Sequence, residues 1–228
     1  MDSFKQAFDL LFSFDRELLR IIGVTLRMSF FSTAVSCIIG LPLGTLLGTH
    51  SFRGKAFVKK LINTLMGLPP VVAGLIVYFL FTHYGPLGKL NMLFTVRVMV
   101  VAQCLLITPV VTALTSSFVE ERARPVIDTA KGMGLSGRKT LFLTLSESRG
   151  MLSSVVLNAF GRSIAEVGAV SIVGGNIQWK TRVMTTAIML ETNKGNFSFA
   201  LALGIILLII AFAVNAAASF TVKEKSDG

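Results

Sequence analysis

Five apolar segments, each about as long as a bilayer is thick, constrain the fold of this chain more than any other feature of its sequence. They lie at about residues 24–49, 61–82, 97–118, 151–173 and 198–222. An α-helix needs about 20 mostly apolar residues to cross the hydrocarbon core of a membrane. Only 15% of the residues are charged, against about a quarter in a soluble domain. The sequence therefore predicts an all-α membrane protein with about five transmembrane helices, built as one unit over residues 1–228.

The first twenty residues differ from the five apolar segments. Their apolar side chains recur at the spacing of one helix face, at Phe4, Phe8, Leu11, Phe12, Leu18 and Leu19. A helix with one apolar face can lie on the membrane surface or pack against a bundle. The pattern predicts an N-terminal amphipathic helix over residues 1–20.

Lys and Arg are unevenly distributed outside the apolar segments. Twelve lie in residues 50–60, residues 119–150 and the C-terminal tail, and eight lie in the connections on the opposite side. Cytoplasmic loops of membrane proteins are enriched in basic residues, so this excess favours an external N-terminus and a cytoplasmic C-terminus. It also accounts for the net charge of +10 without a nucleic-acid partner, since no basic patch interleaved with aromatic residues accompanies it. Cys37 and Cys104 are too few for a metal site, and no cofactor is expected.

Prolines and polar residues interrupt the apolar segments. Pro42, Pro69–Pro70 and Pro109 are each expected to kink or break a helix, because proline lacks the backbone donor. The fourth segment also carries several polar residues, namely Ser153, Ser154, Asn158, Arg162, Ser163, Glu166 and Ser171. A helix facing lipid would not carry them, so this segment is expected to line a cavity or to pack inside an assembly.

Residues 120–150 form the longest segment on the predicted cytoplasmic side and contain strong helix signals. Pro125 can open a helix, and Gly132 and Gly134 can end it. Ser136 can then cap a second helix. The segment is expected to be a helix–turn–helix on the cytoplasmic face, and two interpretations remain open: a knob that docks into a partner, or an amphipathic cover of the bundle.

The stretch DTAKGMGLS within this loop resembles the Glu-Ala-Ala loop in the permease subunits of binding-protein-dependent ABC importers. The matching residues are Asp128, Thr129, Ala130, Gly134 and Leu135. The family usually has a Leu-Pro about a dozen residues later, where this chain has Leu145–Ser146. The resemblance implies that the loop is a coupling helix that fits a cleft in an ATPase subunit.

The resemblance extends from about residue 24 to the end of the chain. GLPLGTLLG, GLPPVVAGLIVYFLF and GRSIAEVGAVSIVGGN resemble the molybdate, sulfate and tungstate branch of the family, and the addition of TTAIMLETNKGNFSFALALGI is most similar to tungstate permeases. It implies the type I importer permease fold in a prokaryotic inner membrane, as a homodimer with lipid around it. The implied partners are two ATP-binding cassette ATPase subunits and an extracytoplasmic tungstate- or oxyanion-binding protein.

The chain itself lacks a G-x-x-x-x-G-K-[ST] phosphate loop, so it is expected to be no enzyme and to rely on ATP hydrolysis by a partner. A molybdate or sulfate permease is the alternative reading. A secondary transporter or channel is less favoured, because the coupling loop would have no role in it.

Arg162 and Glu166 are one helical turn apart in the fourth segment, so their side chains are expected to share a face and can pair at mid-depth. One interpretation is an internal ion pair that holds helices together. The other places the pair beside a translocation path, where Glu166 would weaken the attraction of Arg162 for an anion that must be released. Ser163, Ser171 and Thr108 are further candidates to line such a path, although serine and threonine also bond to carbonyls of their own helix.

Overall fold

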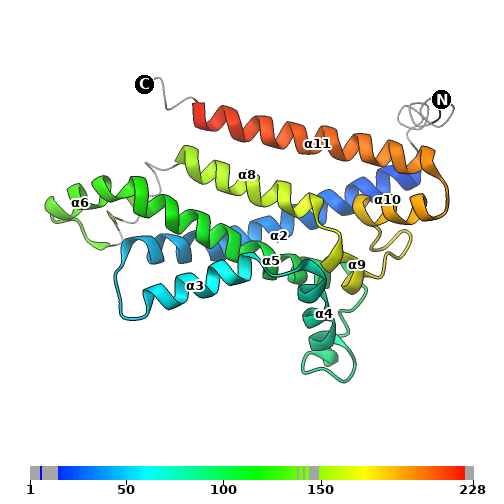
Figure 1. Ribbon diagram of the computed structural model, residues 1–228, viewed down its shortest axis with the longest axis horizontal. Coiled ribbons are helices and arrows are strands. Elements are labelled where there is room, and N and C mark those ends of the chain that lie inside the picture. The colour runs from blue at the N-terminus through cyan, green and yellow to red at the C-terminus, as the bar shows by residue number, and fades with distance from the viewer. Residues whose placement is uncertain (1–5, 7–14, 138, 141, 144–148, 224–228) are drawn as a thin grey trace.

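The computed structural model describes residues 6, 15–137, 139–140, 142–143 and 149–223, and the regular structure in this part of the chain is helical. The elements in chain order are α2 (Arg16–Thr49), α3 (Lys55–Met66), α4 (Pro70–Phe81), η1 (Gly88–Leu90), α5 (Val96–Phe118), η2 (Val119–Ala123), α6 (Arg124–Gly132), α8 (Arg149–Ala165), α9 (Gly168–Gly174), α10 (Met184–Asn193) and α11 (Phe197–Lys223). We call the end of the bundle that carries α6 the inner end and the opposite end, with α10, the outer end (Figure 1).

The five apolar segments correspond to helices α2, α5 and α11 and to two helix pairs, α3–α4 and α8–α9. The three single helices are each long and apolar enough to cross a membrane. The two pairs qualify only when each is taken as one broken span, bent by 97° and 57° respectively. The all-α membrane fold is thus confirmed, with three to five crossings by length and composition.

The first long helix begins earlier than predicted. Asp15 caps α2, and its Oδ1 accepts a hydrogen bond of 3.0 Å from the backbone N–H of Leu18. Residues 16–20 therefore belong to the first spanning helix, and the prediction of a separate amphipathic helix over 1–20 is wrong for them. The rest of that predicted helix, except Gln6, lies outside the described residues.

Only one of the three proline sites breaks a helix. Pro70 occupies the first turn of α4, where the missing N–H has no helical partner to lose, and the chain turns by 97° between α3 and α4. Pro42 and Pro109 instead lie inside continuous helices, α2 and α5. A proline costs one hydrogen bond in such a position, and packing against neighbouring helices can offset that loss.

Helices α2 and α5 lie side by side in the same direction (Figure 1). Three glycines on α2 approach α5 and the start of η2 so closely that an added Cβ would come within 2.8 Å of them, in the pairs Gly40 with Val111, Gly44 with Thr115 and Gly48 with Val119. The two residues of each pair differ by 71 in number, so the helices stay in step with each other along the whole contact. Small residues permit such close backbone approach between membrane helices.

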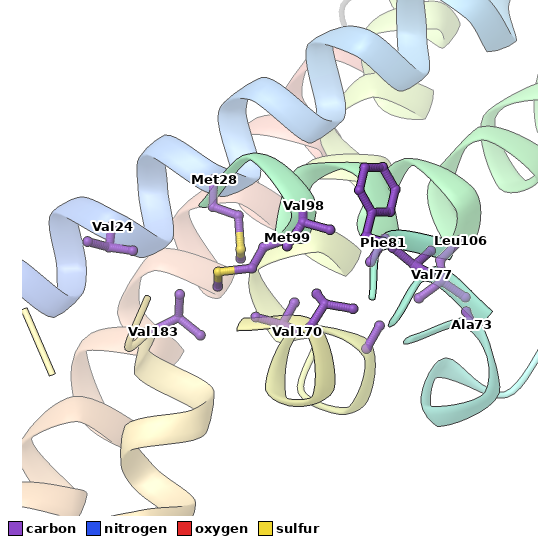
Figure 2. Packing of buried hydrophobic residues seen from close by; sticks show 13 residues of the cluster. Val24, Met28, Ala73, Val77, Phe81, Val98, Met99, Leu106, Val170 and Val183 are labelled. Atoms are coloured by element: carbon purple, nitrogen blue, oxygen red, sulfur yellow. The ribbon is translucent and has the colours of Figure 1, made fainter. Parts of the chain in front are cut away.

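The outer half of the bundle is held by one cluster of buried apolar side chains. Figure 2 shows its 13 members, which come from four helices and the residue before α10, and labels Val24, Met28, Ala73, Val77, Phe81, Val98, Met99, Leu106, Val170 and Val183. A second cluster joins the start of α2 to α8, α10 and α11. Together these clusters fix the short helices α4, α9 and α10 against the long ones.

Candidate functional site

The helix expected in the cytoplasmic loop is present as α6, from Arg124 to Gly132. Ile127 and Ala130 are buried on one side of it, and Ile127 packs against Val119. Asp128 and Thr129 are exposed on the other side. Of the residues carried over from the resemblance, Asp128 and Thr129 are thus accessible at the surface, whereas Ala130 packs the helix against its neighbours.

The end of α6 has the left-handed glycine expected from the sequence. Gly134 has φ +71°, a conformation that glycine adopts without steric cost. The N–H of Leu135 then donates to the carbonyl of Ala130 at 3.1 Å, which closes the helix. Sequence reasoning missed Met133, whose side chain is 66% exposed beside this turn. A long apolar side chain between two glycines in a cytoplasmic loop was the available signal.

The second helix of the loop is only partly described. Gly137, Lys139–Thr140 and Phe142–Leu143 are helical, and the N–H of Thr140 donates to the carbonyl of Ser136 at 2.9 Å. The remaining residues up to 148 lie outside the described part of the chain. Phe142 is 76% exposed, so this face of the loop carries apolar as well as charged groups.

An ionic cluster at the inner end holds the start of the loop that carries α6. Glu120 in η2 accepts from Lys55 of α3 at 2.8 Å and also pairs with Lys59. The sequence does not reveal this cluster, because the partners are about 60 residues apart. It ties the start of the loop to the broken span α3–α4.

The predicted pair of Arg162 and Glu166 does not form. Helix α8 ends at Ala165, and the chain bends by 57° before α9 begins at Gly168. Oε1 of Glu166 accepts instead from the N–H of Ala169 at 3.3 Å, in the first turn of α9. Arg162 is exposed and forms no ion pair with any residue that the structure describes. The assumption of one continuous helix was wrong, because Glu166 lies in the break.

Ser163 lies at the centre of a buried polar network between α2, α5 and α8. Its Oγ donates to Oε1 of Gln103 at 2.9 Å and lies 2.9 Å from Oγ of Ser32. Nε2 of Gln103 donates to the carbonyl of Ser163 at 2.8 Å. All three side chains are fully buried. This geometry favours a structural role for Ser163 over one on a path.

Replacing Gln103 by methionine is expected to lower the free energy of unfolding by about 1–3 kcal/mol, because the hydroxyl and carbonyl of Ser163 lose their partner. Replacing Gln178 by methionine provides a control, since that side chain is exposed and, among the described residues, donates only to Glu17. The melting temperature of the purified protein measures both. If the Gln103→Met and Gln178→Met variants melted at the same temperature, the buried network would not contribute to stability as proposed.

The network also fixes the depth of Arg162. Ser163 is level with Ser32, and about 16 residues of α2, roughly 24 Å, separate Ser32 from Gly48 near the inner end. Ser32 is also 16 residues from Arg16 at the other end of α2, so Arg162 lies level with the middle of that helix. Thr108 faces a different, apolar hollow of about 490 Å³ between α2, α3 and α5. Ser171 is half-buried on α9, so the five predicted path residues do not converge within one chain.

Polar contacts at the outer end hold the connections after α9. Nη1 of Arg182 donates to Oε1 of Glu17 at 2.8 Å. Glu191 on α10 accepts from Lys194 at 2.9 Å and from Asn196 at 2.9 Å. Burial would raise the pKa of Glu191, but these hydrogen bonds and the charges of Lys194 and Arg182 lower it below its ordinary value. Helix α10 lies in what the sequence predicted to be an outer loop, so this region is more ordered than expected.

The sequence is similar to proteins of known transport systems. It is 38% identical over 215 residues to the tungstate uptake system permease protein of Peptoclostridium acidaminophilum, covering 94% of both chains. It is 42% identical to the corresponding protein of Campylobacter jejuni, covering 94% of this chain and 90% of the other. The sulfate transport system permease protein of Salmonella typhimurium is more distant, at 28% identity over 84% of this chain and 73% of the other.

Solved structures share the fold at low sequence identity. The methionine ABC transporter in an inward-facing conformation matches with a TM-score of 0.75 and 16% identity, over 91% of this chain and 95% of the other. The bacterial alginate ABC transporter, in complex with an alginate-bound periplasmic protein, matches with a TM-score of 0.75 and 16% identity, over 95% and 83%. The sequence model of one protein family, the binding-protein-dependent transport system inner membrane component, matches residues 40–223 of this chain. The chain is a multi-pass membrane protein and belongs to this family of ABC importer permeases.

Proposed function

We propose that this chain is the permease subunit of an ATP-driven tungstate importer. The observation that carries the proposal is the identity of 38–42% to two tungstate uptake permeases over 94% of the chain. The sulfate permeases are less similar, at 26–30%. Sulfate and molybdate are therefore the alternative cargoes within the same mechanism.

Two copies of the chain would form the translocation path, with an ATPase subunit beneath each copy and a binding protein at the outer end. The exposed surface of α6 and the turn that follows, made by Asp128, Thr129, Met133 and Gly134, supports docking to an ATPase. The contact of Glu120 with Lys55 and Lys59 would pass the movement of this surface to α3.

Arg162 remains the residue proposed to meet the anion. Its side chain is exposed beside a break between two helices and has no carboxylate partner among the described residues. A second copy of the chain could bring two such arginines to one path. Two such arginines would attract a doubly charged anion, and conduction requires that the anion also be able to leave.

Deletion of the gene is expected to reduce uptake of labelled tungstate by intact cells to background, and the wild-type gene is expected to restore it. Tenfold excess of molybdate or sulfate should compete weakly. Depletion of ATP should stop uptake, whereas collapse of ion gradients at constant ATP should not.

Sulfate or molybdate competing as well as unlabelled tungstate would contradict the cargo and leave the permease mechanism in place. Uptake that survives ATP depletion but stops with the ion gradients would contradict the ATP-driven mechanism itself. The complemented strain serves as the matched control in both tests.

A further inference from the structure

Two adjoining hollows open between α2 and α5 near the outer end. The larger has a volume of about 680 Å³ and contains Arg27 and Arg97. The smaller, of about 340 Å³, contains Arg20, Arg27 and Lys180. Because Arg27 lines both, the hollows form one basic recess with four cations around it.

The positive charge of this recess is not compensated within the described part of the chain. None of the four cations has an ion pair there, and no acidic residue lines either hollow. Arg182, by contrast, lies close by in sequence to Lys180 and is paired with Glu17 at 2.8 Å. The recess therefore has a free positive potential that an anionic ligand would satisfy.

The recess is polar at its outer rim and apolar below it. Arg27, Phe31 and Val35 follow one another on one face of α2 at intervals of four residues, running inward. Arg97 and Val100 follow the same order on α5. Since α2 and α5 run in parallel, both arginines lie above apolar side chains, over a depth of about 12 Å on α2.

The level of the two arginines matches the surface of a membrane. About 23 residues of helix, roughly 35 Å, separate Arg97 from Glu120 in the inner ionic cluster. The hydrocarbon core of a bilayer is about 30 Å thick. With Glu120 and its two lysines at the inner interface, Arg27 and Arg97 lie at the level of the outer lipid phosphates.

We propose that the recess binds an anionic glycerophospholipid. Its phosphate lies between Arg27 and Arg97, and an acyl chain runs inward along Phe31, Val35 and Val100. Arg20 and Lys180 favour a head group with net negative charge, such as phosphatidylglycerol, over a zwitterionic one. A free oxyanion shares the phosphate chemistry, but it is fully hydrated and would gain nothing from the apolar lower part of the recess.

The test uses the complete transporter in nanodiscs that contain phosphatidylglycerol and phosphatidylcholine in equal amounts, followed by mass spectrometry of the lipids that remain bound. The wild type is expected to retain phosphatidylglycerol preferentially. The double variant Arg27→Gln, Arg97→Gln should lose this preference roughly tenfold or more, at about one kcal/mol for each charge removed. Arg53→Gln is the matched control, because Arg53 is exposed and lines neither hollow.

Equal retention of the two lipids by the wild type would overturn the proposal without any variant. An unchanged preference in the double variant would do the same. Displacement of phosphatidylglycerol by millimolar tungstate, with tungstate binding in pure phosphatidylcholine and lost in the double variant, would assign the recess to a free oxyanion instead. The charge-preserving variant Arg27→Lys, Arg97→Lys is expected to keep the preference. If the glutamine variant does not fold, loss of the preference in this lysine variant would overturn the proposal instead.

Discussion

Replacing Gly44 by leucine is expected to remove most of the folded protein from the membrane, whereas the same change at Gly204 leaves most of it in place. A Cβ at Gly44 would lie 2.6 Å from the carbonyl oxygen of Thr112 and 2.6 Å from Cβ of Thr115. The first of these contacts is with backbone, which cannot move aside without separating the two helices. A Cβ at Gly204 meets no atom within 4 Å outside its own helix.

The same pair of sites gives a graded measurement. Alanine at Gly44 is expected to lower the free energy of unfolding by about 1–3 kcal/mol, the usual cost of overpacking, and leucine is expected to cost more. Alanine at Gly204 should change it by less than about 0.5 kcal/mol. Protein yield after mild solubilisation and the melting temperature would measure both series. A Gly44→Leu variant that accumulates and melts like the wild type would contradict the close contact of α2 and α5.

The coarse architecture was predictable because its determinants are local. A run of about 20 apolar residues predicts a helix wherever it occurs in a membrane protein, and α2, α5 and α11 follow from this rule. Helix α6 was also predictable, since Pro125, Gly132 and Gly134 act through their own backbone geometry. These signals need no knowledge of what packs against them.

The α8–α9 break was not predictable in this way. An added Cβ at Gly74 on α4 would come within 2.7 Å of Ala169, and one at Gly168 within 3.0 Å of Val71. The bend is thus stabilised by contacts with a helix about 95 residues earlier in the chain. A periodicity argument assumes one straight helix, and so it placed Glu166 beside Arg162, when its carboxylate in fact accepts from the backbone N–H of Ala169 in the first turn of α9.

The candidate site shows the same limit at the level of single residues. Ser163 and Arg162 are adjacent in sequence, yet one is fully buried between three helices and the other is exposed. Sequence alone could name both as polar residues in a membrane segment. Which of them is buried depends on Gln103 and Ser32, which lie on other helices.

Replacing Gly134 by valine is expected to abolish ATP-driven uptake and co-purification of the ATPase subunit, while leaving the amount of permease in the membrane unchanged. Gly134 has φ +71°, a conformation that is a genuine outlier for a β-branched residue. Without it the bond from the N–H of Leu135 to the carbonyl of Ala130, 3.1 Å long, cannot form, and the chain leaves α6 in another direction. The permease itself should fold, because Gly134 is exposed and a Cβ there would meet nothing within 4 Å.

Asparagine at Gly134 is the matched control, since it tolerates the left-handed conformation better than other residues with a side chain. We expect Gly134→Asn to retain most of the uptake and most of the co-purifying ATPase. In Gly134→Val we expect both quantities to fall at least tenfold below those of the wild type. Normal uptake in the valine variant would contradict the assignment of α6 as the coupling helix. Equal loss in both variants would contradict the conformational explanation, because it would mean that the ATPase needs the bare backbone of glycine at its surface and tolerates no side chain there.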